Sequence, residues 1–130
     1  MSNERSAVKR ILIVDDNPLI LQSLSDAFSG DYLVDVADSG EEGLTVLEQA
    51  ASNGPVIDLI ITDLNMPGID GYELAHRVKE QNHLNRYIPV IMLTSMEITK
   101  EEARAHGCAA YIPKSDMKKV VSMTHILLPR

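Results

Sequence analysis

The stretch Ile11-Leu12-Ile13-Val14-Asp15-Asp16 decides how this chain folds. Four consecutive apolar residues are followed directly by two acidic ones. An uninterrupted apolar run of this kind is typical of a strand that is covered on both faces, as in a parallel sheet. The stretch therefore predicts a buried parallel strand that ends in a pair of carboxylates.

Four further apolar runs follow along the chain, and helical patterns separate them. The predicted strands span residues 11–14, 32–37, 56–61, 89–93 and 109–112. Between the first two, Ile20, Leu24 and Phe28 share one helical face. A βα unit repeated five times predicts an α/β fold with an open parallel sheet and helices on both faces.

The limits of two helices can be predicted from polar and glycine residues, and a further helix from its apolar pattern. Ser39 with Glu42, and Thr99 with Glu102, have the spacing of a capping box at a helix start. Gly107 lies where the fourth helix should end. Apolar residues at helical spacing from 117 to 128 predict the fifth helix.

Polar side chains follow the predicted strands at the edge where open parallel sheets bind ligands. They are Asp15, Asp16, Asp63, Thr94 and Lys114. Carboxylates packed this closely repel one another unless a cation neutralises them, and hard oxygen ligands select Mg²⁺ or Ca²⁺. A carboxylate can also form an aspartyl phosphate, which a hydroxyl and an ammonium group would stabilise. Asp63, between the acidic pair and Lys114, is the best candidate for that nucleophile.

Composition restricts the class of function. The 130 residues fit one domain, and 45% hydrophobic residues are enough for a core. The formal net charge of −7 argues against direct nucleic-acid binding, because phosphate backbones attract basic surfaces. The chain shows no membrane-spanning run and no secretory signal, and its single cysteine, Cys108, fits a reducing compartment. We therefore expect a cytoplasmic protein that does not contact membranes.

Four segments together resemble the receiver domains of two-component response regulators, a superfamily that includes chemotaxis regulators. The segments are residues 11–17 (ILIVDDN), 61–71 (ITDLNMPGIDG), 93–95 (LTS) and 111–114 (YIPK). Each is weak alone, but all lie at predicted strand ends, and the resemblance covers residues 9 to 128. It implies a flavodoxin-like, doubly wound sheet of five parallel strands in the order 2-1-3-4-5, with five helices.

The resemblance also implies a role for each acidic residue. Asp63 would accept a phosphoryl group from a phosphohistidine on a sensor histidine kinase or a histidine phosphotransfer protein. Asp16, Asp63 and the backbone carbonyl of Asn65 would bind Mg²⁺, or Mn²⁺ in its place, and Asp15 would orient the ion through water. Such a receiver is phosphorylated stoichiometrically and is not an enzyme with turnover.

Three residues on the other side of the site would pass the signal on. Lys114 would contact the phosphoryl oxygens, Thr94 would move toward them, and Tyr111 would turn inward behind Thr94. The shift would remodel the surface of the fourth helix, fifth strand and fifth helix. Packing in the core is the alternative role for Tyr111.

The resemblance further implies partners and limits. Residues 1–8 are expected to form a polar tail, residues 9–128 the receiver domain, and residues 129–130 a linker start or the C-terminus. The receiver would control a downstream protein or an output domain outside this chain. It would be a monomer or a phosphorylation-dependent homodimer.

Two residues depart from the family pattern or suggest something particular to this chain. Ser115 follows Lys114 where the family commonly has a proline after a cis peptide bond. A cis bond before a non-proline residue costs ~2.5–4 kcal/mol, so we expect a trans bond here. Met96, two residues past Thr94, would screen an acyl phosphate from water, which predicts slow hydrolysis.

Two other functions compete with the signalling receiver. A small phosphatase would use a similar aspartyl nucleophile but typically carries a second acid two residues later, where this chain has Asn65. A scaffold that has lost phosphorylation is disfavoured by the retention of Asp63 and Lys114, although Ser115 keeps it open.

Overall fold

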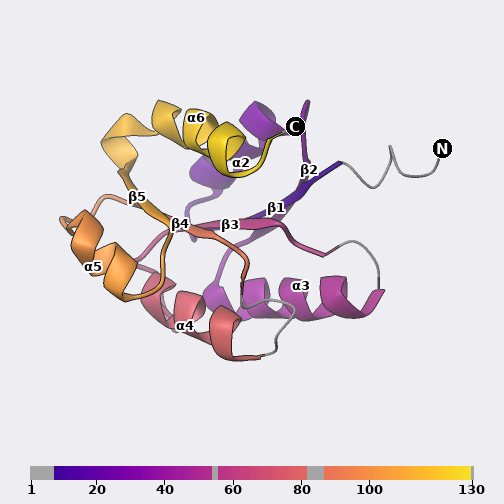
Figure 1. Ribbon diagram of the computed structural model, residues 1–130, viewed down its shortest axis with the longest axis horizontal. Helices are drawn as coiled ribbons and strands as arrows, with labels where there is room; N and C mark the ends of the chain where they lie inside the picture. Colours follow the sequence, from indigo (N-terminus) through magenta and orange to yellow (C-terminus); the bar gives the residue numbers. More distant parts are fainter. Residues whose placement is uncertain (1–7, 54–55, 82–86, 130) are drawn as a thin grey trace.

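Five parallel strands form the centre of the computed structural model, which describes residues 8–53, 56–81 and 87–129 (Figure 1). The strands are β1 (Arg10–Val14), β2 (Leu33–Ala37), β3 (Leu59–Thr62), β4 (Val90–Thr94) and β5 (Ala110–Pro113). The helices are α2 (Pro18–Phe28), α3 (Gly40–Asn53), α4 (Gly71–Gln81), α5 (Lys100–Ala105) and α6 (Lys118–Leu127), with a 3₁₀ turn, η1 (Lys114–Asp116), before α6. The strand order β2-β1-β3-β4-β5 confirms the predicted flavodoxin-like fold.

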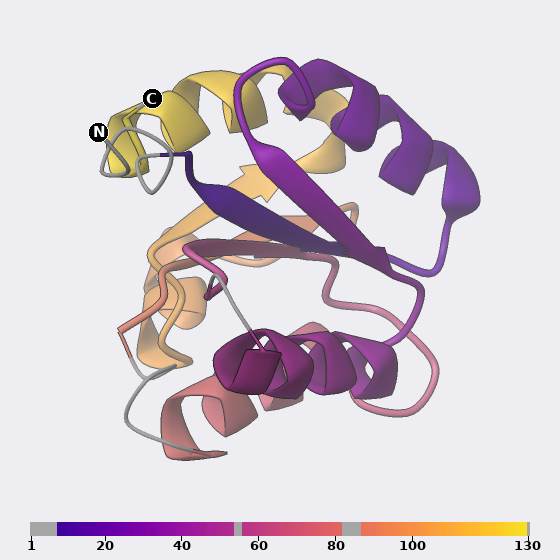
Figure 2. The same ribbon diagram turned by 90° about the vertical axis from the view of Figure 1, so that its right-hand side faces the viewer.

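Helices cover both faces of the sheet, as Figure 2 shows edge-on: α2 and α6 lie on one side and α3 and α4 on the other. Successive residues of β1 point to opposite faces. Ile11 and Ile13 belong to the core with α2 and α6, whereas Leu12 and Val14 belong to the core with α3 and α4. All four side chains are fully buried, which explains the unbroken apolar run.

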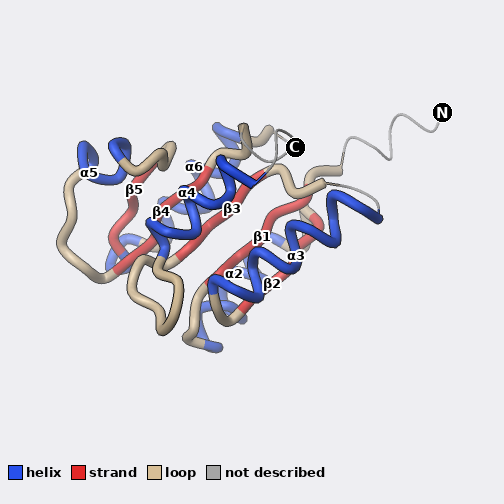
Figure 3. The backbone as a smooth tube through the Cα atoms, turned by 90° about the horizontal axis from the view of Figure 1, so that it is seen from below, coloured by secondary structure: helices blue, strands red, loops and turns tan. Residues whose placement is uncertain are grey.

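The view from the α3 and α4 side places α5 beside the edge strand β5 (Figure 3). Because all strands are parallel, their carboxyl ends meet at one edge of the sheet. Among the described residues, no helix is both long enough and apolar enough to cross a membrane.

At both predicted capping boxes the hydroxyl of the first residue accepts a hydrogen bond at the start of a helix. The Thr99 hydroxyl accepts a hydrogen bond from the Glu102 N–H at 3.0 Å, and the Ser39 hydroxyl accepts one from the Glu42 N–H at 3.1 Å. The Glu42 carboxylate accepts its bond from the Asp38 N–H at 2.7 Å instead of from Ser39. The Glu42 side chain therefore accepts from the N–H of Asp38, one residue before Ser39.

Two strands are shorter than the apolar runs that predicted them. Tyr32 lies before β2, and its hydroxyl donates to the Leu128 carbonyl at 2.6 Å while its ring stacks with that of His125. Residues 56–58 precede β3, where the Asp58 carboxylate accepts the Arg10 N–H at 2.9 Å. Ile57 is buried in the core and Asp58 is paired with Arg10 of β1, whereas Val56 is 43% exposed.

The last helix is slightly shorter than its apolar pattern, from 117 to 128, predicted. The turn η1 follows β5 directly, and α6 begins only at Lys118. The bond between Lys114 and Ser115 is trans, as expected, since the described residues contain no cis peptide bond.

Candidate functional site

Asp15 and Asp16 follow β1 and differ in exposure. Asp15 is 2% exposed, and Asp16 is exposed to solvent. The Asp15 N–H donates to the Ala37 carbonyl at 3.1 Å, and its Oδ1 accepts the Asn17 N–H at 2.9 Å. The first carboxylate is therefore fixed by the backbone, whereas the second can respond to a ligand.

Asp63 lies directly after β3 and is 6% exposed. Its N–H donates to the Val14 carbonyl at 3.0 Å, which places it beside the end of β1. Its Oδ1 accepts the Leu64 N–H at 2.7 Å and, more weakly, the Asn65 N–H at 3.4 Å. Backbone donors thus orient the carboxylate while its other oxygen faces the rest of the site.

Lys114 connects the two buried carboxylates. Its Nζ lies 2.9 Å from Asp15 Oδ2 and 3.0 Å from Asp63 Oδ2. Lys114 directly follows β5, at the far edge of the sheet from β2, so its long side chain reaches back across the carboxyl edge. The structure therefore brings Asp15, Asp63 and Lys114 together, as the sequence predicted.

The pKa values of Asp15 and Lys114 are both raised in this cluster. Burial raises the pKa of Asp15 above its ordinary value, although hydrogen bonds from Lys114 and the Asn17 N–H act in the opposite direction. Burial lowers the pKa of Lys114, but hydrogen bonds to Asp15 and Asp63 outweigh this and raise it overall. Asp15 thus still carries a net cost of being charged, which a further cation would relieve.

Three carboxylates are close enough to share a metal ion. One oxygen from each of Asp15, Asp16 and Asp63 lies within 4.8 Å of the others. With Lys114 included, the cluster carries three negative charges and one positive charge, an imbalance that one divalent cation would cancel. The donors are all hard oxygens, which fit Mg²⁺ or Mn²⁺ better than a soft metal.

Thr94 of β4 and Tyr111 of β5 both form a hydrogen bond with the backbone of Met96. Thr94 is fully buried at the end of β4, and its Oγ1 accepts the Met96 N–H at 3.2 Å. The half-buried Tyr111 donates its hydroxyl to the Met96 carbonyl at 3.4 Å. The bond to Thr94 is at the upper end of the ordinary range for an N–H donor, and the bond from Tyr111 is longer than an ordinary hydroxyl bond. The Met96 side chain is 45% exposed, and its effect on phosphoryl lifetime stays a prediction.

Gly71 and Glu41, which were not among the predicted site residues, hold the loop after β3 in place. The Gly71 N–H donates to the Leu64 carbonyl at 2.9 Å, and a Cβ at Gly71 would lie 2.3 Å from the Asp63 carbonyl oxygen. The Glu41 carboxylate accepts the Ile69 N–H at 3.3 Å. These contacts close the loop that carries Asn65, whose role as a metal ligand stays a prediction. Gly71 lies in the segment 61–71 that carried the family resemblance, whereas nothing in the sequence marked Glu41.

Comparison with known proteins assigns this arrangement to a family. The family model described as the response regulator receiver domain matches residues 11–125. The polar-differentiation response regulator DivK of Brucella anthropi is 33% identical over 108 residues, which cover 82% of this chain and 84% of DivK. Other curated relatives, including sensor histidine kinases and probable transcriptional regulators, are longer, and the chain spans only 8 to 56% of them.

Solved structures agree with this assignment. A putative response regulator from Chloroflexus aurantiacus superposes with a TM-score of 0.79 at 33% identity, covering 95% of this chain and 99% of that one. The phosphorylated cyanobacterial phytochrome response regulator RcpA gives a TM-score of 0.78 at 26% identity, with coverage of 94% and 95%.

Proposed function

The chain belongs to the response regulator receiver domain family, and from this premise we propose that it signals through a phosphoryl group carried by Asp63. Receiver domains act in two-component signal transduction and are not classical enzymes. The observation that carries the proposal is the pairing of Lys114 Nζ with Asp63 Oδ2 at 3.0 Å, next to two further carboxylates. That arrangement supplies a nucleophile, a cation and a metal site within one cluster.

The proposed donor is a phosphohistidine on a sensor histidine kinase or a histidine phosphotransfer protein. A carboxylate oxygen of Asp63 attacks the phosphorus, a P–O bond forms, and the P–N bond to the imidazole breaks. Lys114 stays beside the new phosphoryl oxygens and offsets their charge. Mg²⁺ or Mn²⁺, held by Asp15, Asp16, Asp63 and the Asn65 carbonyl, would supply Lewis-acid stabilisation of the transferred group.

The proposed output is a shift of Thr94 and Tyr111. The Thr94 hydroxyl exchanges its long bond from Met96 for a shorter bond to a phosphoryl oxygen, and Tyr111 turns into the space behind it. This exchange favours one of two arrangements of α5, β5 and α6, because only one of them makes the new contacts. The present weak contacts at Met96 support the proposal.

We propose residues 9–128 as the receiver unit, acting in the cytoplasm without contact with membranes or nucleic acid. The predicted tail (residues 1–8) lies outside the described residues except for Val8, as does Arg130 of the predicted 129–130 end. The target is a downstream protein or an output domain, and the receiver acts as a monomer or as a phosphorylation-dependent homodimer. Asn65, where a phosphatase would have its second acid, favours stoichiometric phosphorylation over turnover.

Intact-protein mass spectrometry after incubation with acetyl phosphate tests the proposal. We expect wild type to gain one phosphoryl group only when Mg²⁺ is present, and Asp63→Asn to gain none. The same experiment with a phosphorylated histidine protein as the donor follows. If neither donor labels the folded wild-type chain, the chain is a scaffold and the proposal is wrong.

A further inference from the structure

We infer that His76 of α4 and His106 at the end of α5 form a second metal site, which takes Zn²⁺ or a similar divalent transition-metal ion. His76 Nε2 lies 3.0 Å from His106 Nδ1. Without a metal, one of these nitrogens donates a hydrogen bond and the other accepts it. The pair lies on other elements than the acidic cluster of Asp15, Asp16 and Asp63, which follow β1 and β3. The inference therefore goes beyond the proposed function.

The separation of the two nitrogens fits a shared ion. Zn–N bonds are about 2.0–2.1 Å long, so two nitrogens at a tetrahedral angle on one ion lie about 3.3 Å apart. The ion lies beside the line that joins the nitrogens, and one ring has to turn slightly to meet it. The His76 side chain is exposed and can turn, and its ring stands at 81° to the His106 ring, which leaves room for both around one ion.

The His106 ring is held in place before any ion arrives. The ring of Tyr72 stacks on it, with the centroids 3.8 Å apart and the planes at 13°. The His106 N–H donates to the carbonyls of Glu102 and Ala103 at 3.2 and 3.1 Å, which fixes its backbone. A ligand that is already ordered loses little conformational freedom when it binds. One ligand of the pair is therefore fixed, and the other adjusts.

Glu102 supplies a third ligand by rotation. It lies one turn before His106 on the same face of α5, and its side chain is exposed. Burial and then the charge of Glu102 raise the pKa of the Tyr72 hydroxyl, so the carboxylate is close to the ring that stacks on His106. At present no third His, Cys, Asp or Glu ligand atom of the described residues lies within 4.8 Å of both nitrogens. Two histidines, a glutamate and a water form a ligand set that Zn²⁺ uses.

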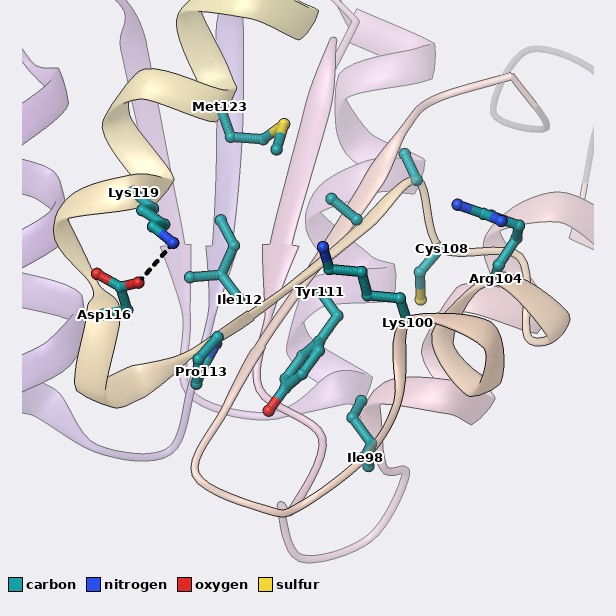
Figure 4. Close-up of a pocket in the computed structure, with 12 residues that line it drawn as sticks. Ile98, Lys100, Arg104, Cys108, Tyr111, Ile112, Pro113, Asp116, Lys119 and Met123 are labelled. Atoms are coloured by element: carbon teal, nitrogen blue, oxygen red, sulfur yellow. Dashed lines mark ion pairs between the residues drawn. The ribbon is translucent and has the colours of Figure 1, made fainter.

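Two other groups near the pair do not act as ligands. Cys108 is buried and lines the pocket between α5, β5 and α6 (Figure 4). Burial raises the pKa of its thiol to about 11, whereas metals bind the thiolate. Lys79 packs against Gly107, where its Cε lies 2.6 Å from the position of an added Cβ. Its positive charge opposes that of Glu102, so the two histidines supply most of the affinity.

Isothermal titration calorimetry of the full chain with ZnCl₂ tests the inference. The buffer contains about 10 mM MgCl₂, which occupies the acidic cluster of hard oxygen ligands. We expect wild type to bind one Zn²⁺ per chain. His76→Gln and His106→Gln should each weaken binding by about tenfold or more, because loss of a residue that only supports a metal ligand already costs 10–100-fold.

His125→Gln is the matched control. It removes a histidine of α6, which lies on the other side of the sheet from α4 (Figure 2). Zn²⁺ binding should change less than about twofold in this variant. Equal binding by wild type, His76→Gln and His106→Gln, or a loss in His125→Gln as large as theirs, would overturn the inference.

A second pair of variants separates ligation from charge. Glu102→Gln and Glu101→Gln remove the same charge from neighbouring exposed positions of α5. We expect Glu102→Gln to weaken Zn²⁺ binding by about tenfold and Glu101→Gln by less than about twofold. Equal effects of the two variants would overturn the assignment of Glu102 as a ligand.

Two further measurements identify the ligand atoms and the number of chains. Long-range ¹H–¹⁵N spectra of the imidazoles should show Zn²⁺ at His76 Nε2 and His106 Nδ1. One Zn²⁺ per two chains, with dimers in sedimentation, would mean that the histidines bridge two copies, and the inference would be wrong. All variants should be phosphorylated by acetyl phosphate like wild type. Phosphorylation of a wild-type chain that binds no Zn²⁺ overturns the second metal site and leaves the proposed function standing.

Discussion

The two halves of the carboxyl edge of the sheet are held in different ways. In the half at β1 and β3, Asp15 and Asp63 each accept a backbone N–H bond of 2.9 Å or less and share Lys114. In the half at β4 and β5, Thr94 and Tyr111 have bonds of 3.2 and 3.4 Å to Met96. The first half is fixed before any ligand arrives, and the second can exchange its partners at little cost. We therefore call the half at β1 and β3 the fixed half and the half at β4 and β5 the movable half.

Loss of the acceptor should have the largest effect. Asp63→Asn removes the nucleophile from the fixed half, and we expect no phosphorylation in the mass-spectrometric assay. The fold should remain, because the amide oxygen can still accept the Leu64 N–H and one repelling charge is gone. Asp26→Asn, an exposed change on α2, is the control and should be labelled like wild type. Labelling of Asp63→Asn would show that the acceptor is another residue.

Removal of Lys114, which lies between Asp15 and Asp63, should have the second-largest effect. Lys114→Ala leaves two buried carboxylates without their common partner, and since the Lys114 side chain is only 17% exposed, we expect a loss of roughly 2–4 kcal/mol in the free energy of unfolding. Urea titration measures this loss, and added Mg²⁺ should recover part of it. Lys118→Ala should lose little. If Mg²⁺ had no effect on Lys114→Ala, the acids would not form a metal site.

The dependence of stability on alkaline pH tests how tightly the segment before β5 packs, because the buried Cys108 lies there. Burial raises the pKa of its thiol to about 11 from 9.0. The folded chain therefore holds this proton more tightly than the unfolded chain. The resulting stability is fully present below about pH 9 and is lost as the pH rises through about 11, which amounts to roughly 2–3 kcal/mol.

Cys108→Ala isolates that effect from the parallel titration of Lys114. The difference in unfolding free energy between wild type and Cys108→Ala should shrink between pH 9 and 11. Urea titrations at several pH values measure it. A constant difference would mean that solvent reaches the thiol and that the base of β5 is looser than the structure indicates.

The loop of the fixed half should tolerate no added methyl group at Gly71. In Gly71→Ala the new Cβ meets backbone atoms of Asp63 and Leu64, which cannot rotate away, so we expect a loss of about 1–3 kcal/mol and weaker Mg²⁺ binding. Gly30→Ala is the control, because no atom lies within 4 Å of its Cβ position. Thermal unfolding with and without Mg²⁺ measures both. Equal stability of the two variants would show that the loop is not fixed.

The smallest effect is expected in the movable half. Tyr111→Phe removes only the 3.4 Å bond to the Met96 carbonyl, so stability should change by less than about 0.5–1 kcal/mol. Phosphorylation should also proceed as in wild type. A larger loss of stability would place Tyr111 in the fixed half and favour its alternative role in the core.

The sequence predicted those site residues that follow strands, because the end of a parallel strand is readable from an apolar run. That Asp15, Asp63 and Lys114 come together was predicted in this way, and their roles stay predictions. Glu41 was not, because its bond to the Ile69 N–H joins segments 28 residues apart and leaves no local pattern.

The histidines show the same limit. The ring nitrogens of His76 and His106 lie 3.0 Å apart, although the two residues are 30 positions apart in the sequence and no local pattern joins them. The ring of Tyr72 stacks on that of His106 at 3.8 Å. Tyr32 illustrates the opposite error, since an apolar run cannot distinguish a strand residue from one that packs below it. Contacts between elements therefore needed the structure.

The bond from the Tyr32 hydroxyl to the Leu128 carbonyl has a mechanical consequence. It ties the C-terminal end of α6 to the segment before β2, and the His125 ring stacked on Tyr32 adds to this tie. The ten residues of α6 span about 15 Å. Because its C-terminal end is held, α6 would rotate about that end and would not shift along its axis. A tilt of roughly 10° would then displace its N-terminal end, near Lys119, by about 2.6 Å and leave Leu128 in place.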